Sequence, residues 1–159
     1  DVIVAGEGEI AVEQLMASNF DPSAWAQIPG IIFRGADGKP VRTAATRLIA
    51  NLDAQPWPDR ESIDIPRYMQ AWRQHHGTAS VSVITARGCP YHCNWCSHSV
   101  YGHTHRRRSP GAVADEVEWL LGRYDPDMLW IADDVFTIHP GWLFQYAAEL
   151  KGRGIRIPF

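Results

Sequence analysis

Three cysteines close together are the residues of this 159-residue chain whose types and spacing best suit chemistry. Cys89, Cys93 and Cys96 are spaced C-x3-C-x2-C, and the sequence has no other cysteine. They are odd in number and too clustered to cross-link a fold, and no secretory signal is recognisable. They therefore predict metal binding in a reducing compartment, the cytoplasm. Soft thiolates suit both zinc and iron–sulfur clusters, which leaves two metals open.

The number of protein ligands separates these two metals. A structural zinc ion takes four, so a histidine would have to join the cysteines. The candidates are His92, His98, His103 and His105. A cubane iron–sulfur cluster takes one thiolate per iron, so three cysteines leave one iron free to bind a small molecule. Tyr91 and Trp95 would then stack on a heteroaromatic ligand, whereas in a zinc site they would only pack.

The residues on either side predict how the cysteine loop is held. Residues 79–86 alternate in polarity and are rich in Val and Ile, which predicts a strand that ends directly before the loop. Ser109 and Pro110 predict the start of a helix, because Ser is a good N-cap and Pro fits the first helical position. The apolar residues of this helix recur at helical spacing: Val113, Val117, Leu120, Leu121 and Tyr124.

A second strand and helix follow the first pair. Residues 128–132 are a continuous apolar run, which predicts a strand buried on both faces, and the run ends at Asp133 and Asp134. A further helix starts at Pro140 and a further strand at 155. The inner residues expected for that helix are Leu143, Phe144, Ala147 and Leu150. The alternation implies a parallel sheet with right-handed crossovers, either open or the first part of a barrel.

The N-terminal 50 residues predict another strand–turn–helix unit. Residues 2–5 suggest a strand buried on both faces, and Gly6, Glu7 and Gly8 form the turn after it. The expected apolar side of the following helix consists of Ile10, Leu15 and Met16. Such a turn is a common ligand site in open α/β sheets, although a plain connection explains the same glycines. Residues 35–38 then predict the turn of a hairpin.

Residues 51–65 are interrupted by prolines and predict a linker, because neither a helix nor a central strand tolerates that pattern. A short helix over 66–76 follows, with Tyr68, Met69 and Trp72 expected on its packed face. No acidic residue occurs between Asp64 and Asp115, so this interval has a positive field that suits an anionic ligand or is simply solvated. The sequence has no apolar run of 18 residues, and we expect no membrane-spanning helix.

The cysteine loop resembles the signature of the radical S-adenosylmethionine superfamily. The resemblance rests on C-x3-C-x2-C, on Trp95 directly before the last cysteine, on Arg87-Gly88 before the first, and on the preceding strand. It implies a partial (β/α)6 barrel and a 4Fe-4S cluster on Cys89, Cys93 and Cys96. It also implies that S-adenosylmethionine chelates the open iron and is cleaved to a 5′-deoxyadenosyl radical, which abstracts hydrogen from a substrate.

The same resemblance gives Asp133 and Asp134 an expected role. Members of the superfamily carry a short motif, often Gly-Gly-Glu, at the end of the second strand, and it contacts the methionine amino group. Residues 132–134, Ala-Asp-Asp, stand at that place here, and a carboxylate opposite an ammonium is physically reasonable. The sequence departs from the commonest motif and does not decide which aspartate acts. Both could instead cap the next helix.

The N-terminal residues are similar to the cobalamin-binding subgroup of the superfamily. Gly6-Glu7-Gly8-Glu9 before a helix, Ile28-Pro29-Gly30-Ile31, and a proline-rich linker into the cluster strand carry this resemblance. It implies cobalamin as a further cofactor, near Gly6, Glu7 and Gly8. The expected organisation is the C-terminal part of a Rossmann-like cobalamin domain over 1–50, a linker over 51–76, and the first strand–helix units of the barrel over 77–159.

The sequence thus predicts a radical S-adenosylmethionine enzyme, a methyltransferase or cyclase, acting on a small molecule. A one-electron donor such as flavodoxin or ferredoxin would be its partner. Both ends look like interrupted strands, so we expect a fragment that can be inactive alone. The alternative is a zinc-binding module of three cysteines and a histidine, with Arg106, Arg107 and Arg108 on nucleic acid. It explains the histidines but not the strand–helix units.

Overall fold

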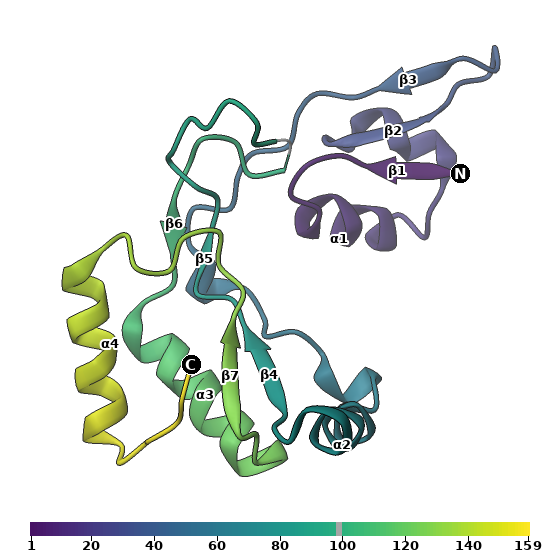
Figure 1. The fold of residues 1–159 in the computed structure, drawn as a ribbon. Helices are drawn as coiled ribbons and strands as arrows, with labels where there is room; N and C mark the ends of the chain where they lie inside the picture. Colours follow the sequence, from purple (N-terminus) through teal and green to yellow (C-terminus); the bar gives the residue numbers. More distant parts are fainter. Residues whose placement is uncertain (98–99) are drawn as a thin grey trace. The chain divides into compact units, whose positions relative to one another are not determined.

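The computed structural model describes residues 1–97 and 100–159, so His98 lies outside the described residues. The chain divides into two compact units (Figure 1). One consists of residues 1–50 and 89–104, and the other of residues 51–88 and 105–159. Each unit is described by itself below. Among the described residues, none of the helices combines the length and hydrophobicity needed to cross a membrane.

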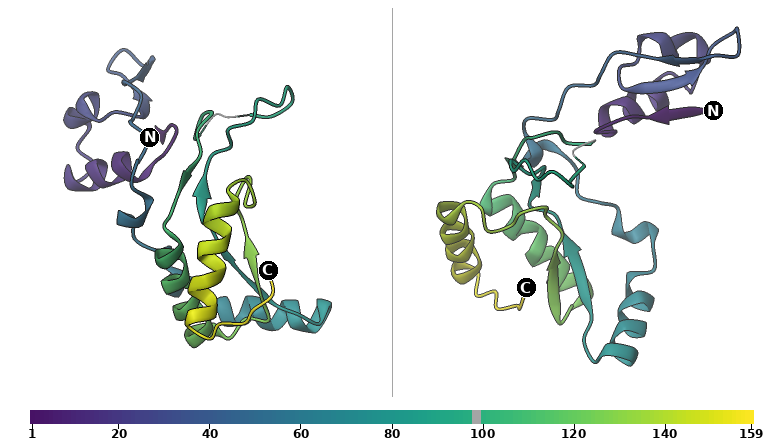
Figure 2. Two further views of the ribbon diagram at one scale, coloured as in Figure 1. Left: turned by 90° about the vertical axis from the view of Figure 1, so that its left-hand side faces the viewer. Right: turned by 45° about the horizontal axis from the view of Figure 1, so that its top comes forward.

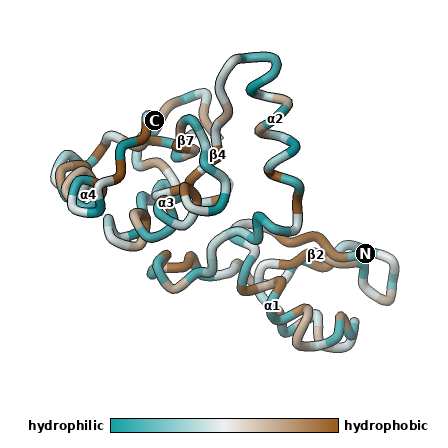
Figure 3. Tube along the Cα trace, turned by 90° about the horizontal axis from the view of Figure 1, so that it is seen from below, coloured by the Kyte–Doolittle hydropathy of each residue, from teal (hydrophilic) through white to brown (hydrophobic). Residues whose placement is uncertain are grey.

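The first unit is built on a three-stranded antiparallel sheet of order β1-β2-β3. Its strands are β1 (Val2–Val4), β2 (Ile31–Arg34) and β3 (Pro40–Arg42). Phe33 faces Val41 across the β2–β3 pair, which confirms the predicted hairpin. A helix, α1 (Glu9–Ala17), and a short 3-10 helix, η1 (Pro22–Gln27), cover the sheet. β2 is a hydrophobic segment (Figure 3), and its Ile31 lies in the core with Leu15.

Two expectations for this unit were wrong. β1 is not buried on both faces, because its Ile3 is 62% exposed. β1 pairs with antiparallel β2, and side chains alternate along a strand, so Val2 and Val4 face the core while Ile3 points away. Met16 is also 62% exposed. The buried residues of α1 are one helical turn apart, Ala11 and Leu15, and Met16 lies beyond this stripe.

The second unit is organised around the parallel strands β4 (Ser80–Val83) and β7 (Met128–Ile131). Ser80 pairs with Met128 and Val83 with Ile131, which confirms the predicted parallel arrangement. The helices α3 (Pro110–Tyr124) and α4 (Pro140–Gly152) lie next to each other along this pair, and α2 (Ile65–His76) lies beside β4 (Figures 1 and 2). A short antiparallel pair, β5 (Ala86–Arg87) and β6 (Arg106–Arg107), precedes α3.

The start and apolar face of α3 are as predicted. Ser109 is the N-cap, and its hydroxyl accepts a hydrogen bond from the amide of Ala112 at 3.2 Å. Val113, Val117 and Leu120 are fully buried. These side chains lie in one core with residues of β4 and β7, and burial of each contributes about 1.5–3 kcal/mol to the stability of the unit.

Other predicted inner faces were partly wrong. On α2 only Met69 is buried, whereas Tyr68 and Trp72 are exposed. On α4 the buried residues are Tyr146 and Leu150, and Phe144 and Ala147 are exposed. An aromatic cluster of Phe136, Trp142 and Tyr146 turns the helix so that its aromatic face points inward. The sequence pattern favoured the aliphatic face because it contains more Leu and Ala.

β7 is also less buried than predicted, since only Leu129 is fully enclosed and Trp130 is 62% exposed. Residues 155–159 are not assigned as a strand, although Leu129 donates its amide to the carbonyl of Pro158 at 2.9 Å. Ile155 and Ile157 pack against the core of the unit. The segment therefore lies beside β7, as the predicted order of elements requires, without forming a complete ladder.

The predicted linker, residues 51–65, contains two short 3-10 helices, η2 (Leu52–Ala54) and η3 (Arg60–Ser62). It is fastened to α3 at several points. The ring of Trp57 lies 5.8 Å from that of Trp119, and Asp53 accepts a hydrogen bond from the amide of Ser109 at 2.9 Å. This segment is therefore an integral part of the second unit rather than a free tether.

A buried carboxylate joins the linker to α3. Glu116 is 1% exposed, and its Oε1 lies 2.6 Å from Nη2 of Arg60, which is 7% exposed. Its Oε2 accepts from Nη1 of Arg108. Arg60 and Arg108 also donate to the carbonyls of Ser82 and Ile84. Two arginines thus share one carboxylate inside the protein.

We predict that Glu116→Gln destabilises the full-length protein by about 3–5 kcal/mol, because two buried guanidinium groups lose their counter-charge. Urea unfolding of the variant and the wild type measures this loss. The matched control is Glu61→Gln, which breaks the exposed Glu61–Arg123 pair and should cost about 1 kcal/mol or less. Equal, small losses in both variants would contradict this account of Glu116.

Candidate functional site

The three cysteines lie in the 89–104 part of the first unit. Cys89 is half-buried, and Cys93 and Cys96 are exposed. The amide of Cys96 donates to the carbonyl of Cys93 at 3.1 Å, so these two residues sit on one tight turn. Trp95, between them, is 89% exposed. Thiols and an aromatic ring are therefore presented together on a short loop.

The thiols fit a 4Fe-4S cluster in number and chemical kind. They are free, they are accessible, and they offer one soft ligand to each of three irons. Within residues 1–97 and 100–159, no three His, Cys, Asp or Glu side chains already form a group that could hold a metal ion. The cysteine side chains would have to converge when a metal binds, as ligands on flexible loops commonly do.

The histidines proposed for a zinc site have other neighbours. The rings of His92 and His103 stack on each other with their centroids 4.0 Å apart. His105 belongs to the second unit, where its ring lies 5.1 Å from that of His139. Burial, and then the nearby Arg107, lower the pKa of His105. His105 is therefore favoured in its neutral form at neutral pH.

Asp133 and Asp134 follow β7 directly, and their environments differ. The Asp133 side chain is fully buried. Its oxygens accept from the amide of Thr85 at 2.6 Å, the hydroxyl of Thr85 at 2.5 Å, the amide of Ala86 at 3.1 Å and Nη2 of Arg107 at 3.1 Å. Asp134 is exposed, and its side chain has no hydrogen bond or ion pair with the part of the chain that the structure describes. Of these two aspartates, Asp134 is therefore the one whose carboxylate is free to bind a ligand.

Arg107 completes the surroundings of Asp133. The same Nη2 donates to the carbonyl of Phe136 at 2.6 Å, and the guanidinium carbon lies 4.2 Å from the ring centroid of Trp142. The sequence alone suggested a positive interval for an anionic ligand or for solvent, or, in the zinc alternative, a contact with nucleic acid. Instead, the Arg107 and Arg108 side chains are only 8% and 12% exposed. No local signal shows this, because the partners Asp133 and Glu116 are distant or on another element.

The predicted cofactor turn, Gly6-Glu7-Gly8, lies at the end of β1. Gly6 has a positive φ of 85°, which an L-residue rarely adopts. Glu7 is 3% exposed, and its carboxylate accepts from the amide of Ile49 at 2.8 Å. Gly6 and Glu7 line a small cavity of about 170 Å³ together with Gly30 and Thr46. The turn thus combines a backbone that a ligand can approach with a buried acidic anchor.

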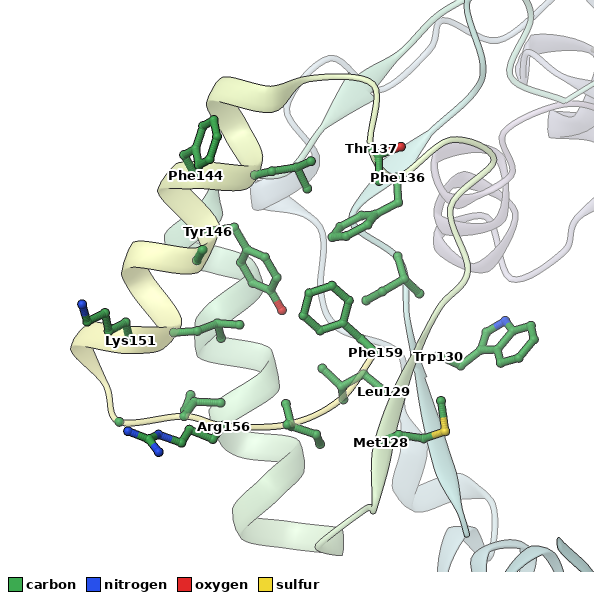
Figure 4. Close-up of a pocket in the computed structure, with 17 residues that line it drawn as sticks. Met128, Leu129, Trp130, Phe136, Thr137, Phe144, Tyr146, Lys151, Arg156 and Phe159 are labelled. Carbon is green, nitrogen blue, oxygen red and sulfur yellow. The ribbon is translucent and has the colours of Figure 1, made fainter.

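A larger, apolar cavity of about 1060 Å³ lies in the second unit between β7, α4 and residues 155–159 (Figure 4). Phe136, Tyr146 and Phe159 point toward one another there, while Phe144 points away. Burial raises the pKa of Tyr146 to about 12. The phenol therefore stays protonated at neutral pH. Most of the lining is hydrocarbon, so this cavity offers packing surface rather than reactive groups.

Comparison with known proteins identifies relatives along nearly the whole chain. No family model matches the sequence. The chain is 30% identical to the anaerobic magnesium-protoporphyrin IX monomethyl ester cyclase of Rubrivivax gelatinosus, covering 99% of this chain and 28% of the cyclase. It is 31% identical to the cobalamin-dependent radical SAM methyltransferase TokK of Streptomyces tokunonensis, covering 97% of this chain and 22% of TokK. The chain thus spans about a quarter of the length of these relatives.

Two solved structures share the fold. OxsB, a cobalamin-dependent S-adenosylmethionine radical enzyme, matches over 98% of this chain and 22% of its own, with a TM-score of 0.77 and 19% identity. TsrM of Kitasatospora setae, a radical S-adenosylmethionine methyltransferase, matches over 96% of this chain and 29% of its own, with a TM-score of 0.65 and 20% identity.

The combination of a C-x3-C-x2-C loop, a parallel strand–helix unit and these relatives defines the class. Along nearly its whole length the chain is similar to a segment of enzymes that are described as cobalamin-dependent and radical S-adenosylmethionine-dependent. The fold prediction is confirmed, and the zinc-binding alternative finds no support among the relatives. The domain boundaries and the roles of individual site residues remain predictions.

A third aspartate, Asp127, mirrors Asp133 at the opposite end of the β4–β7 pair. Its Oδ2 accepts from the amide of Ala79 and from Nε of Arg73, both at 2.8 Å. The hydrogen bond from Arg73, and then that from Ala79, lower the pKa of Asp127. Both ends of the central strand pair are thus held by an aspartate that bridges a backbone amide and an arginine.

We predict that Asp127 contributes stability that depends on pH in the acidic range. Because its pKa is lower in the folded state, its contribution is complete above the ordinary Asp value of about 3.9 and is lost as the pH falls through the lower folded value. Asp127→Asn should therefore be less stable than the wild type at pH 7, and the difference should shrink below about pH 4. Urea midpoints measured across this pH range test the prediction, which a pH-independent difference would contradict.

Proposed function

We propose that this chain is the part of a radical S-adenosylmethionine enzyme that binds its 4Fe-4S cluster, through Cys89, Cys93 and Cys96. We further propose that the whole protein uses cobalamin and methylates or cyclises a small molecule. The observation that carries the proposal is the accessible three-cysteine loop in a chain that matches such enzymes along nearly its full length. When bound and reduced, the cluster would supply the electron needed for reductive cleavage of S-adenosylmethionine.

The chain's own residues contribute binding and orientation. The three thiolates would hold three irons, and the positions of Tyr91 and Trp95 beside them would let their exposed rings stack on an adenine-like group. Asp134 is our candidate for the ammonium group of S-adenosylmethionine, since its carboxylate is exposed. Asp133 is a poor candidate, because protein donors already occupy its oxygens.

The cobalamin proposal rests on the relatives and on the turn after β1. TokK and OxsB are described as cobalamin-dependent, and the OxsB and TsrM structures contain cobalamin. In this chain Gly6 would let the backbone come close to the cofactor, and buried Glu7 would fix the turn through Ile49. A one-electron donor such as flavodoxin or ferredoxin would reduce the cluster. The exposed cysteine loop of this chain suits electron transfer from such a partner.

Anaerobic reconstitution of the full-length protein tests the cluster. We expect four irons and four sulfides per chain, and their loss in Cys93→Ala, because removing one thiolate leaves two irons without a protein ligand. Ser97→Ala is the matched control and should keep the cluster, since Ser97 lies next to the ligands but is not one of them. One zinc and no sulfide per chain would refute the proposal.

Replacement of Asp134 tests the assignment of the ammonium contact. We expect Asp134→Asn to weaken S-adenosylmethionine binding by about tenfold or more, the usual effect of losing one charge-assisted hydrogen bond. Calorimetric titration of the reconstituted protein measures the affinity. Asp37→Asn, in the exposed turn between β2 and β3, should leave it unchanged. An unchanged affinity in Asp134→Asn would remove Asp134 from the site.

A further inference from the structure

The cysteine segment, residues 88–105, is connected to the second unit at both ends by a very short pair of antiparallel strands. β5 leads into the segment and β6 follows it, and they share only the pairs Ala86–Arg107 and Arg87–Arg106. Two antiparallel strands of this length are not stable by themselves in water. Their spacing must therefore be fixed by contacts with the rest of the unit.

The Asp133 carboxylate makes those contacts with both strands at once. On the entering side it accepts from the amides of Thr85 and Ala86 and from the Thr85 hydroxyl. On the leaving side it pairs with Arg107. A carboxylate has about four lone-pair sites, and these four donors use them all.

Two of the partners of Asp133, Thr85 and Arg107, are themselves held in place. Thr85 is fully buried, and its carbonyl accepts the amide of Arg108 at 2.9 Å, one residue beyond β6. Arg107 is fixed by the carbonyl of Phe136 and by the ring of Trp142 on α4. Buried groups therefore hold the two strand ends against the end of β7 and against α4.

We propose that Asp133 is a positioning residue for the cysteine segment: with Thr85 and Arg107 it clamps the two strands from which residues 88–105 depart. The inference rests on the proposed function, because it concerns the loop that would hold the cluster. A loop with fixed ends loses less conformational entropy when its ligands converge on a metal. The clamp thus lowers the cost of assembling three thiolates around one cluster, without touching the cluster ligands.

Two variants separate this role from general stability. Asp133→Asn removes the ion pair and leaves Arg107 buried without a counter-charge, so it is the stronger change. Thr85→Val keeps the size of the side chain and the ion pair, but it removes one hydrogen bond to the carboxylate. The matched control is Asp127→Asn, which removes the corresponding carboxylate at the opposite end of the β4–β7 pair.

The first measurement is the rate of iron release to a chelator from the reconstituted, full-length protein. We expect it to rise about tenfold in Asp133→Asn and about threefold in Thr85→Val, and to stay within about twofold of the wild type in Asp127→Asn, the scale expected for losing a charged or a neutral hydrogen bond. Equal rates in Thr85→Val, Asp127→Asn and the wild type would overturn the inference.

The second measurement is amide hydrogen exchange in the metal-free protein, which does not depend on the cluster. Exchange over 86–88 and 105–108 should be at least fivefold faster in Thr85→Val than in Asp127→Asn. If the wild type holds no cluster but this difference appears, the proposed function fails and the clamp stands. If the wild type holds its cluster but no such difference appears, the clamp fails and the proposed function stands.

Discussion

The arrangement of the second unit near the cysteine segment depends on the buried carboxylate of Asp133. A charge removed from water is costly unless it is paired and fully hydrogen-bonded, and Asp133 satisfies both conditions with four donors. These donors come from Thr85, which lies between β4 and β5, from the start of β5 and from the end of β6. One side chain, which follows β7, therefore contacts both the start of β5 and the end of β6.

Two neighbouring arginines connect the surroundings of Asp133 to α3. Arg107 and Arg108 are consecutive in an extended segment, and successive side chains of such a segment point to opposite sides. Arg107 reaches Asp133 after β7, and Arg108 reaches Glu116 on α3. Glu116 also binds Arg60 of the linker. Arg107 and Arg108 thus connect the end of β7, α3 and the linker, and both form ion pairs inside the unit.

Much of the fold could be predicted from the sequence because it depends on short-range patterns. The Ser109-Pro110 helix start, the stripe of Val113, Val117 and Leu120, and the hairpin around residues 35–38 follow from local propensity and periodicity. The burial of Ile3, Met16 and Phe144 was misjudged, because the face that packs depends on which element covers it. The contacts of Arg107 with Asp133 and of Arg60 with Glu116 join residues far apart in sequence, and no local pattern marks them.

In the candidate site, too, some features follow from the local sequence and others depend on contacts between residues far apart in the sequence. The cysteine spacing alone predicted three thiol ligands, since their chemistry depends on residue type and separation. The adjacent aspartates could not be distinguished in this way, because both follow a strand and both can accept hydrogen bonds. Tertiary structure separates them: Asp133 faces inward to four protein donors, while Asp134 faces solvent. An acidic pair at the end of a strand can therefore divide its work, with one carboxylate building the frame and the next left free for a ligand.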